Sequence, residues 1–88
     1  MLEATVTITN RAGLHTRPAA TLVKTAAKFH SEFMICKDGM EINGKSIIGV
    51  MTLAAEQGSQ LELRFEGDDE EQAKAVVVDL FERGFDEQ

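Results

Sequence analysis

Cysteine is almost absent from this chain, and so is any long apolar run. A single cysteine, Cys36, among 88 residues excludes an intramolecular disulfide and a zinc site built on cysteine pairs, and it fits a reducing compartment. No segment is apolar over enough residues to span a bilayer, and the N-terminus has neither the basic stretch nor the apolar run of a signal peptide. These absences predict a cytoplasmic protein without membrane insertion.

Positive charge is also scarce. Nine Lys and Arg residues against fifteen Asp and Glu give a net charge of −6, which argues against binding of nucleic acid or of an anionic membrane over a broad basic surface. The chain has no Pro/Gly-rich linker, no low-complexity tract and no tandem repeat, and 43% of its residues are hydrophobic, which is enough for one core. We therefore expect residues 1–88 to form a single domain.

Four segments show the patterns of short strands. Residues 2–9 and 60–66 alternate apolar and polar side chains, which is the period of a half-buried strand. Residues 31–37 and 40–42 are separated by an Asp-Gly pair, which is typical of tight hairpin turns. The second pair of segments should therefore form antiparallel neighbours.

Two helices are predicted in the first two thirds of the chain. Apolar residues recur at helical spacing from Thr16 to Phe29, and Pro18 lies in the first turn, where its missing N–H costs little. A second, short helix should cover residues 47–51, because Ser46 before it is a suitable N-cap.

A long helix is predicted in the last third of the chain. Residues 67–69 open it, and Gly84 is a suitable C-cap. The apolar stripe expected to face the core consists of Ala73, Val76, Val77, Leu80 and Phe81. The element order is then β-α-β-β-α-β-α. It favours an α+β fold, an open-faced β-sandwich in which a four-stranded, mainly antiparallel sheet carries three helices on one face. The order of the strands in the sheet is left open.

A histidine lies where a glycine-containing loop meets the first predicted helix. His15 follows Gly13 and precedes Thr16 and Arg17. Unpaired N–H groups in the first turn, from Thr16 onward, can cradle a phosphoryl group, and the helix dipole favours negative charge there by about 0.3–1 kcal/mol. The guanidinium of Arg17 can hold phosphate oxygens during transfer. These residues suit transient phosphorylation of a histidine, while a surface histidine beside a solvated arginine would give the same pattern.

Two motifs resemble those of the HPr family, the histidine-containing phosphocarriers of the bacterial phosphoenolpyruvate-dependent sugar phosphotransferase system. The first runs from Gly13 to Ala20, GLHTRPAA, and resembles the phosphohistidine signature of the family. The second runs from Asn43 to Leu53, NGKSIIGVMTL, and resembles its regulatory serine region. The spacing of the motifs, the length and the element order agree over essentially the whole chain.

The resemblance implies a phosphocarrier rather than an enzyme with independent turnover. His15 would accept a phosphoryl group on Nδ1 from phosphorylated enzyme I and pass it to the IIA components of sugar permeases. Arg17 would balance the transferring charge, and no metal or cofactor is needed on this side of the reaction. Such a transfer rests mainly on positioning and electrostatics. Ala12 stands where many relatives carry Asn or Ser, so any hydrogen bond from that position must come from elsewhere in this chain.

Ser46 is the candidate regulatory residue. An N-cap serine needs no further function, and its loss typically costs about 1 kcal/mol. The resemblance implies phosphorylation of Ser46 by HPr kinase/phosphorylase. Phosphoserine would add roughly −1.5 to −2 charges at a helix N-terminus and would repel an acidic partner.

The resemblance places the partner-docking surface on the first two predicted helices. Ile47, Ile48 and Met51 cannot all face the core of a short helix, so one or two of them should be exposed. Leu22 and Val23 are expected in the core. The predicted docking residues are Thr16, Ala20, Lys24, Ile47, Ile48 and Met51.

The charge distribution agrees with a carrier that meets acidic partners. Residues 1–45 hold six Lys and Arg and four Asp and Glu, a balance of +2, whereas residues 46–88 hold three and eleven, a balance of −8. The face around His15 would then be neutral to basic and able to steer acidic partners. A monomer is expected, because a carrier that visits several partners needs this face free.

Three other interpretations stay open. A carrier of the nitrogen-related phosphotransferase branch would share the His15 motif. A regulatory module, phosphorylated on Ser46, would act as an allosteric partner of a transcription repressor that governs catabolite repression. An unrelated α+β domain would need another explanation for the pairing of His15 with Arg17.

Overall fold

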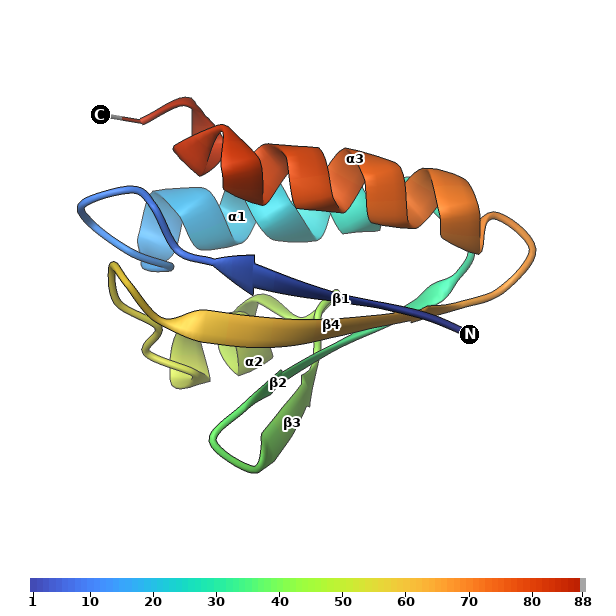
Figure 1. The fold of residues 1–88 in the computed structure, drawn as a ribbon, viewed down its shortest axis with the longest axis horizontal. Helices are drawn as coiled ribbons and strands as arrows, with labels where there is room; N and C mark the ends of the chain where they lie inside the picture. The colour runs from blue at the N-terminus through green and yellow to red at the C-terminus, as the bar shows by residue number, and fades with distance from the viewer. Residues whose placement is uncertain (88) are drawn as a thin grey trace.

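A computed structural model describes residues 1–87 of the protein (Figure 1). The elements in chain order are β1 (Leu2–Thr7), α1 (Thr16–Ala26), β2 (Glu32–Lys37), β3 (Met40–Asn43), α2 (Ile47–Thr52), β4 (Gln60–Glu66), α3 (Glu70–Glu82) and a single 3₁₀ turn, Gly84–Asp86. This confirms the predicted order β-α-β-β-α-β-α. None of the helices within residues 1–87 has the length and apolar character needed to cross a membrane.

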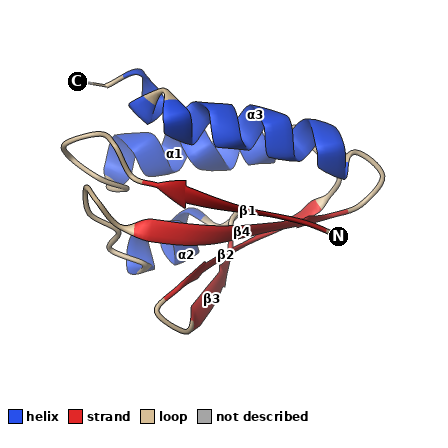
Figure 2. Cartoon of the chain, viewed as in Figure 1, coloured by secondary structure: helices blue, strands red, loops and turns tan. Residues whose placement is uncertain are grey.

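The four strands form one sheet in the order β1-β4-β2-β3, and every pairing is antiparallel. Its register brings apolar residues of neighbouring strands side by side: Val6 faces Leu61, and Ile35 faces Leu63 on one side and Ile42 on the other. Helices α1 and α3 cover this face, as Figure 2 shows, and the opposite face is open. The predicted open-faced α+β sandwich is therefore confirmed, and the structure supplies the strand order that the sequence left open.

The core lies between the sheet and the helices. Phe33 and Phe65 stack with their ring centroids 4.9 Å apart, and Leu22 of α1 is fully buried. Burial of each such side chain contributes about 1.5–3 kcal/mol. Val23 is half-buried and packs against the edge of the core, so both residues lie where they were predicted.

The first strand and the first helix are each shorter than predicted. β1 ends at Thr7 rather than residue 9, although Ile8 still donates to Ser59 O at 2.9 Å. α1 ends at Ala26 rather than Phe29. The N–H groups of Lys28 and Phe29 bond to carbonyls three residues back instead of four, and the ammonium group of Lys45 donates to the Phe29 carbonyl at 2.7 Å.

The prediction for α3 was wrong at one position. Val76 is 42% exposed, whereas Ala73, Val77 and Leu80 are buried. The helix packs against β1, and Val78 rather than Val76 contacts the core and lines a groove with Leu2. The helix ends just before Gly84, whose φ of +62° lies in the left-handed region that favours glycine, in agreement with its predicted capping role.

Candidate functional site

His15 occupies the N-cap position of α1. Its backbone is extended, with φ −102° and ψ −158°, and its side chain is exposed and forms no capping hydrogen bond. An N-cap normally uses its side chain to satisfy a first-turn N–H. Here the imidazole is left available to a partner instead.

The first turn of α1 offers two backbone donors next to this imidazole. Ala19 is the first residue whose N–H bonds within the helix, to His15 O at 2.8 Å, and Pro18 has no N–H. The N–H groups of Thr16 and Arg17 have no acceptor among residues 1–87. Unpaired donors at a helix N-terminus form a site for an anion, and the helix dipole adds to the attraction.

Arg17 supplies a positive charge in the first turn of α1. The Arg17 side chain is exposed and forms no ion pair within the described part of the chain. Residues 4–31 contain four Lys and Arg residues and no Asp or Glu. A guanidinium free of carboxylates can bind phosphate oxygens in a bidentate manner.

Gly13 brings the loop before α1 against the loop after α2. The N–H of Leu14 donates to Ala55 O at 2.9 Å, and a Cβ on Gly13 would collide with that same carbonyl. Gly13 also has a φ of +74°, so glycine is required here for two reasons. In Figure 1 these two loops lie at the same end of the molecule as the C-terminus.

A hollow of about 320 Å³ adjoins His15 at this end of the molecule. Met51 and Glu56 line it together with His15. The sequence analysis missed Glu56, because residues some forty positions apart carry no common spacing signal. The full lining consists of Ala12, Leu14, His15, Met51, Ala54, Ala55 and Glu56.

Ser46 caps α2 as the sequence predicted. Its Oγ accepts a hydrogen bond from the N–H of Gly49 at 3.1 Å, and the side chain is half-buried. The preceding Lys45 is held by its contact with Phe29, so the start of α2 is tied to the end of α1.

The apolar residues of α2 are more exposed than expected. Ile48 is 76% exposed, Met51 44% and Ile47 38%, so all three reach solvent rather than one or two. The reason is the length of the helix: its six residues bury a single side chain, Val50. Three neighbouring apolar side chains on the surface are typical of a protein-binding patch.

The predicted α1 residues of the docking surface share one face of that helix. Thr16 and Lys24 are exposed and Ala20 is half-buried, at a spacing of four that places them in one row. Because α1 packs against α2, the structure brings these residues into the neighbourhood of Ile47, Ile48 and Met51.

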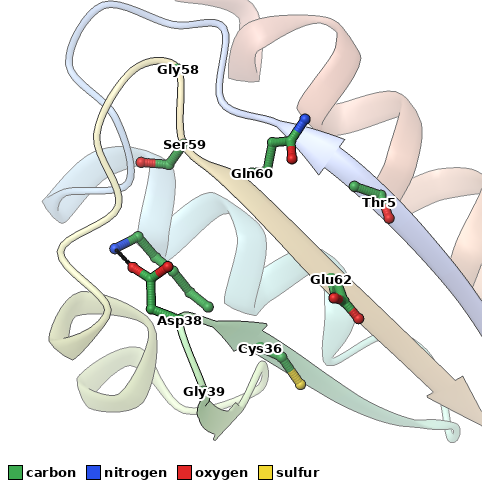
Figure 3. A pocket seen from close by; sticks show the side chains of 9 residues that line it. Thr5, Cys36, Asp38, Gly39, Gly58, Ser59, Gln60 and Glu62 are labelled. Carbon is green, nitrogen blue, oxygen red and sulfur yellow. Dashed lines mark hydrogen bonds and ion pairs between the residues drawn. The ribbon is translucent and has the colours of Figure 1, made fainter.

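A second hollow, of about 690 Å³, lies on the open face of the sheet at the β2–β3 hairpin (Figure 3). Cys36 lies in it, and its Sγ is 3.6 Å from a carboxylate oxygen of Glu41. Partial burial and this hydrogen bond raise the pKa of the Cys36 thiol, which disfavours the nucleophilic thiolate. Within residues 1–87, no three His, Cys, Asp or Glu side chains gather as a metal site requires.

Comparison with known proteins gives the same family over nearly the whole chain. A family model described as the PTS HPr component phosphorylation site matches residues 2–83. The phosphocarrier protein HPr of Treponema pallidum (strain Nichols) is 47% identical over all 88 residues of both chains. The crystal structure of HPr from Thermoanaerobacter tengcongensis superposes with a TM-score of 0.97 at 49% identity, covering 100% of this chain and 99% of that one.

Two further relatives carry other names. The phosphocarrier protein NPr of Escherichia coli (strain K12) is 39% identical over 98% of this chain and 97% of its own. The HPr-like protein Crh of Halalkalibacterium halodurans is 42% identical over 94% of this chain and 99% of its own. A dimer of HPr from Thermoanaerobacter tengcongensis also matches, with a TM-score of 0.78 at 49% identity over 97% of this chain and 98% of that one.

Proposed function

The chain belongs to the HPr family, the phosphocarriers of the phosphotransferase system, and on this premise we propose that it carries the phosphoryl group on His15. The observation that supports this most strongly is the position of His15 at the N-cap of α1, with an uncommitted imidazole beside the free N–H groups of Thr16 and Arg17. The donor is phosphorylated enzyme I, and the acceptors are the IIA components of sugar permeases.

The transfer exchanges one phosphorus–nitrogen bond for another. The lone pair of Nδ1 of His15 attacks the phosphorus, the bond to the histidine of enzyme I breaks, and its electron pair returns to the donor imidazole. The protein supplies position and charge: the N–H groups of Thr16 and Arg17 bind phosphoryl oxygens, and the guanidinium of Arg17 balances their charge. Transfer to a IIA component runs the same steps in reverse on a second partner.

The docking surface is proposed to consist of Thr16, Ala20 and Lys24 of α1 and Ile47, Ile48 and Met51 of α2. Their exposure on two helices that pack together supports this, and the absence of acidic residues from positions 4–31 fits acidic partners. We propose the monomer as the form that transfers phosphate, since the apolar patch on α2 has to be open to each partner. Sedimentation of the phosphorylated chain tests this.

Regulation is proposed to act through Ser46. A phosphoryl group on its Oγ would lie at the N-terminus of α2, directly beside Ile47 and Ile48, and its charge would repel an acidic enzyme I. The modifying enzyme would be HPr kinase/phosphorylase. Phosphorylated Ser46 would also create the surface that a catabolite repressor recognises.

Transfer assays distinguish the sugar branch from the nitrogen-related branch that the similarity to NPr keeps open. Phosphorylated chain is mixed with a sugar IIA and, separately, with a nitrogen IIA, and the phosphoryl group on each acceptor is quantified. Faster transfer to the sugar IIA supports the proposal, and faster transfer to the nitrogen IIA favours the other branch. His15→Ala, which should take no phosphoryl group, is the control for both.

A further inference from the structure

Asn10 is a buried polar residue in the loop between β1 and α1. It is only 3% exposed, and its Nδ2 donates to two acceptors: the carbonyl of Gly13 at 2.9 Å and the Glu87 carboxylate at 3.2 Å. The N–H of Gly13 donates back to Asn10 O at 3.2 Å. Reversing the side-chain amide would point its oxygen at two acceptors, so the hydrogen bonds fix its orientation. Asn10 thus ties the loop of His15 to the C-terminal segment.

The C-terminal segment takes an unusual path to reach Asn10. Gly84, Phe85 and Asp86 have φ values of +62°, +57° and +59°, and this left-handed conformation is costly for the two non-glycine residues. Burial of Phe85 against Phe81, with ring centroids 5.0 Å apart, helps to hold the turn. The ion pair of the Arg83 guanidinium with Asp86, at 2.7 Å, holds it from outside. The turn directs Glu87 back to the loop before α1.

The Gly13 carbonyl is the group that Asn10 controls. The peptide group between Gly13 and Leu14 is held at both ends. Its N–H donates to the Ala55 carbonyl, and its oxygen accepts a hydrogen bond from the buried Asn10 amide. Further along the chain, beyond Leu14 and His15, come the N–H groups of Thr16 and Arg17 that an anion would meet. A carbonyl oxygen turned toward a phosphoryl group would repel it, so the loop favours an anion only while this oxygen is held inward.

Asn10 also keeps an unmet hydrogen-bonding requirement. Its Oδ1 is buried and meets no donor among residues 1–87. Burying an amide oxygen without a hydrogen-bond donor costs free energy that an apolar side chain at the same position would not cost. Such groups in folded proteins call for a reason other than packing.

We propose that Asn10 is a positioning residue for phosphoryl transfer at His15, which holds the Gly13 carbonyl away from the phosphoryl group and is itself anchored by Glu87. The inference rests on the proposed function of His15 and adds a requirement that His15 and Arg17 alone do not impose. It assigns the C-terminal turn a role in the reaction, because that turn supplies the anchor.

Phosphorylation kinetics with enzyme I and phosphoenolpyruvate test the proposal on the full chain. Asn10→Leu keeps the branching at Cγ but has two methyl groups in place of the amide. It should lower kcat by about ten-fold, since a small misplacement near the reacting atoms can cost up to about 100-fold. KM should stay unchanged, because the docking surface on α1 and α2 is not altered. Glu87→Ala should lower kcat in the same direction, and Glu87→Gln, which keeps an acceptor for Asn10, should behave like the wild type.

An NMR measurement on the wild type gives a second readout that does not depend on how well a variant folds. Phosphorylation should shift the side-chain amide resonances of Asn10, whereas those of Asn43, on the β3 edge of the sheet, should remain in place. A folded Asn10→Leu chain with kcat within about two-fold of the wild type would overturn the proposal, as would an Asn10 amide that does not respond. A wild type that takes no phosphoryl group on His15 overturns the proposed function as well, so the two failures are distinguishable.

Discussion

Ser31, directly before β2, is hydrogen-bonded to Asp69, the N-cap of α3. The backbone N–H of Ser31 donates to Oδ1 of Asp69 at 2.9 Å, and the Ser31 hydroxyl donates to the same oxygen. The N–H of His30 donates to the other carboxylate oxygen at 2.8 Å. The Ser31 hydroxyl, followed by the His30 N–H, lowers the pKa of Asp69 from 3.8 to about 2. One carboxylate therefore holds together two segments that are 38 residues apart.

This carboxylate predicts an acid-sensitive contribution to stability. A carboxyl group with a lowered pKa in the folded state stabilises the fold above its unfolded pKa of 3.8, and the contribution is lost as the pH falls through about 2. Asp69→Asn should therefore have a smaller free energy of unfolding than the wild type at pH 7. The two chains should converge between pH 4 and pH 2.

Urea unfolding followed by circular dichroism over this pH range measures the convergence. Asp68→Asn removes the same formal charge from an exposed neighbour and is the matched control. Equal pH profiles for Asp69→Asn and Asp68→Asn would show that the bonds to Ser31 and His30 contribute nothing specific.

Ser46 has a structural role that can be separated from its proposed regulatory role. Ser46→Ala removes the cap on Gly49 and should lower the free energy of unfolding by about 1 kcal/mol. Ser46→Asp keeps a capping oxygen and adds a charge beside Ile47 and Ile48, so it should leave stability near that of the wild type and slow phosphorylation by enzyme I. Thr5→Asp, on the open face of the sheet, adds the same charge away from the docking surface and should not slow the reaction. Equal rates for Ser46→Asp and the wild type would contradict electrostatic inhibition.

Ile48 provides the sharpest test of the docking surface. The Ile48 side chain is 76% exposed, so Ile48→Glu should leave the melting temperature unchanged. If Ile48 is a binding hot spot, the substitution should raise KM for phosphorylation by enzyme I by about ten-fold. Val76→Glu places the same carboxylate on an exposed valine of α3 and should leave KM unchanged. A melted Ile48→Glu protein, or equal KM values for the two variants, would contradict this assignment.

Ala54 carries backbone strain beside the hollow of His15. Its φ of +50° lies in the left-handed region, which costs an L-residue about 1–2 kcal/mol. Ala54→Gly should therefore raise the free energy of unfolding by about 1 kcal/mol once the greater freedom of unfolded glycine is counted. Ala27, exposed and at φ −66°, is the control: Ala27→Gly relieves no strain and should destabilise the fold. Urea denaturation measures the free energy of unfolding of the two variants and the wild type. Destabilisation by Ala54→Gly would contradict the account.

The parts of the fold that sequence patterns predicted are those set by local periodicity. The alternation of apolar and polar side chains over residues 60–66 predicted β4 with its observed bounds. The serine before residues 47–51 predicted the N-cap of α2. The glycine at position 84 predicted where α3 ends. In each case the signal lies within one element, so neighbouring residues suffice to find it.

The parts that escaped prediction depend on contacts between distant segments. The segment after α1 is bound by Lys45 at the Phe29 carbonyl, and on α3 Val78 rather than Val76 packs against the core. The environment of His15 shows the same limit. Its motif could be found in the sequence, but the contribution of Glu56 to its hollow, and the bond from Asn10 to Glu87, are visible only once the chain has folded.

Intact-mass analysis tests the central claim that His15 carries the phosphoryl group. The chain is incubated with phosphoenolpyruvate, magnesium and enzyme I, and its mass is measured before and after mild acid, with His15→Ala in parallel and a known carrier to prove that enzyme I is active. We expect a single acid-labile phosphoryl adduct on the wild type and none on His15→Ala. No adduct on the wild type, or an adduct that persists on His15→Ala, would contradict the account.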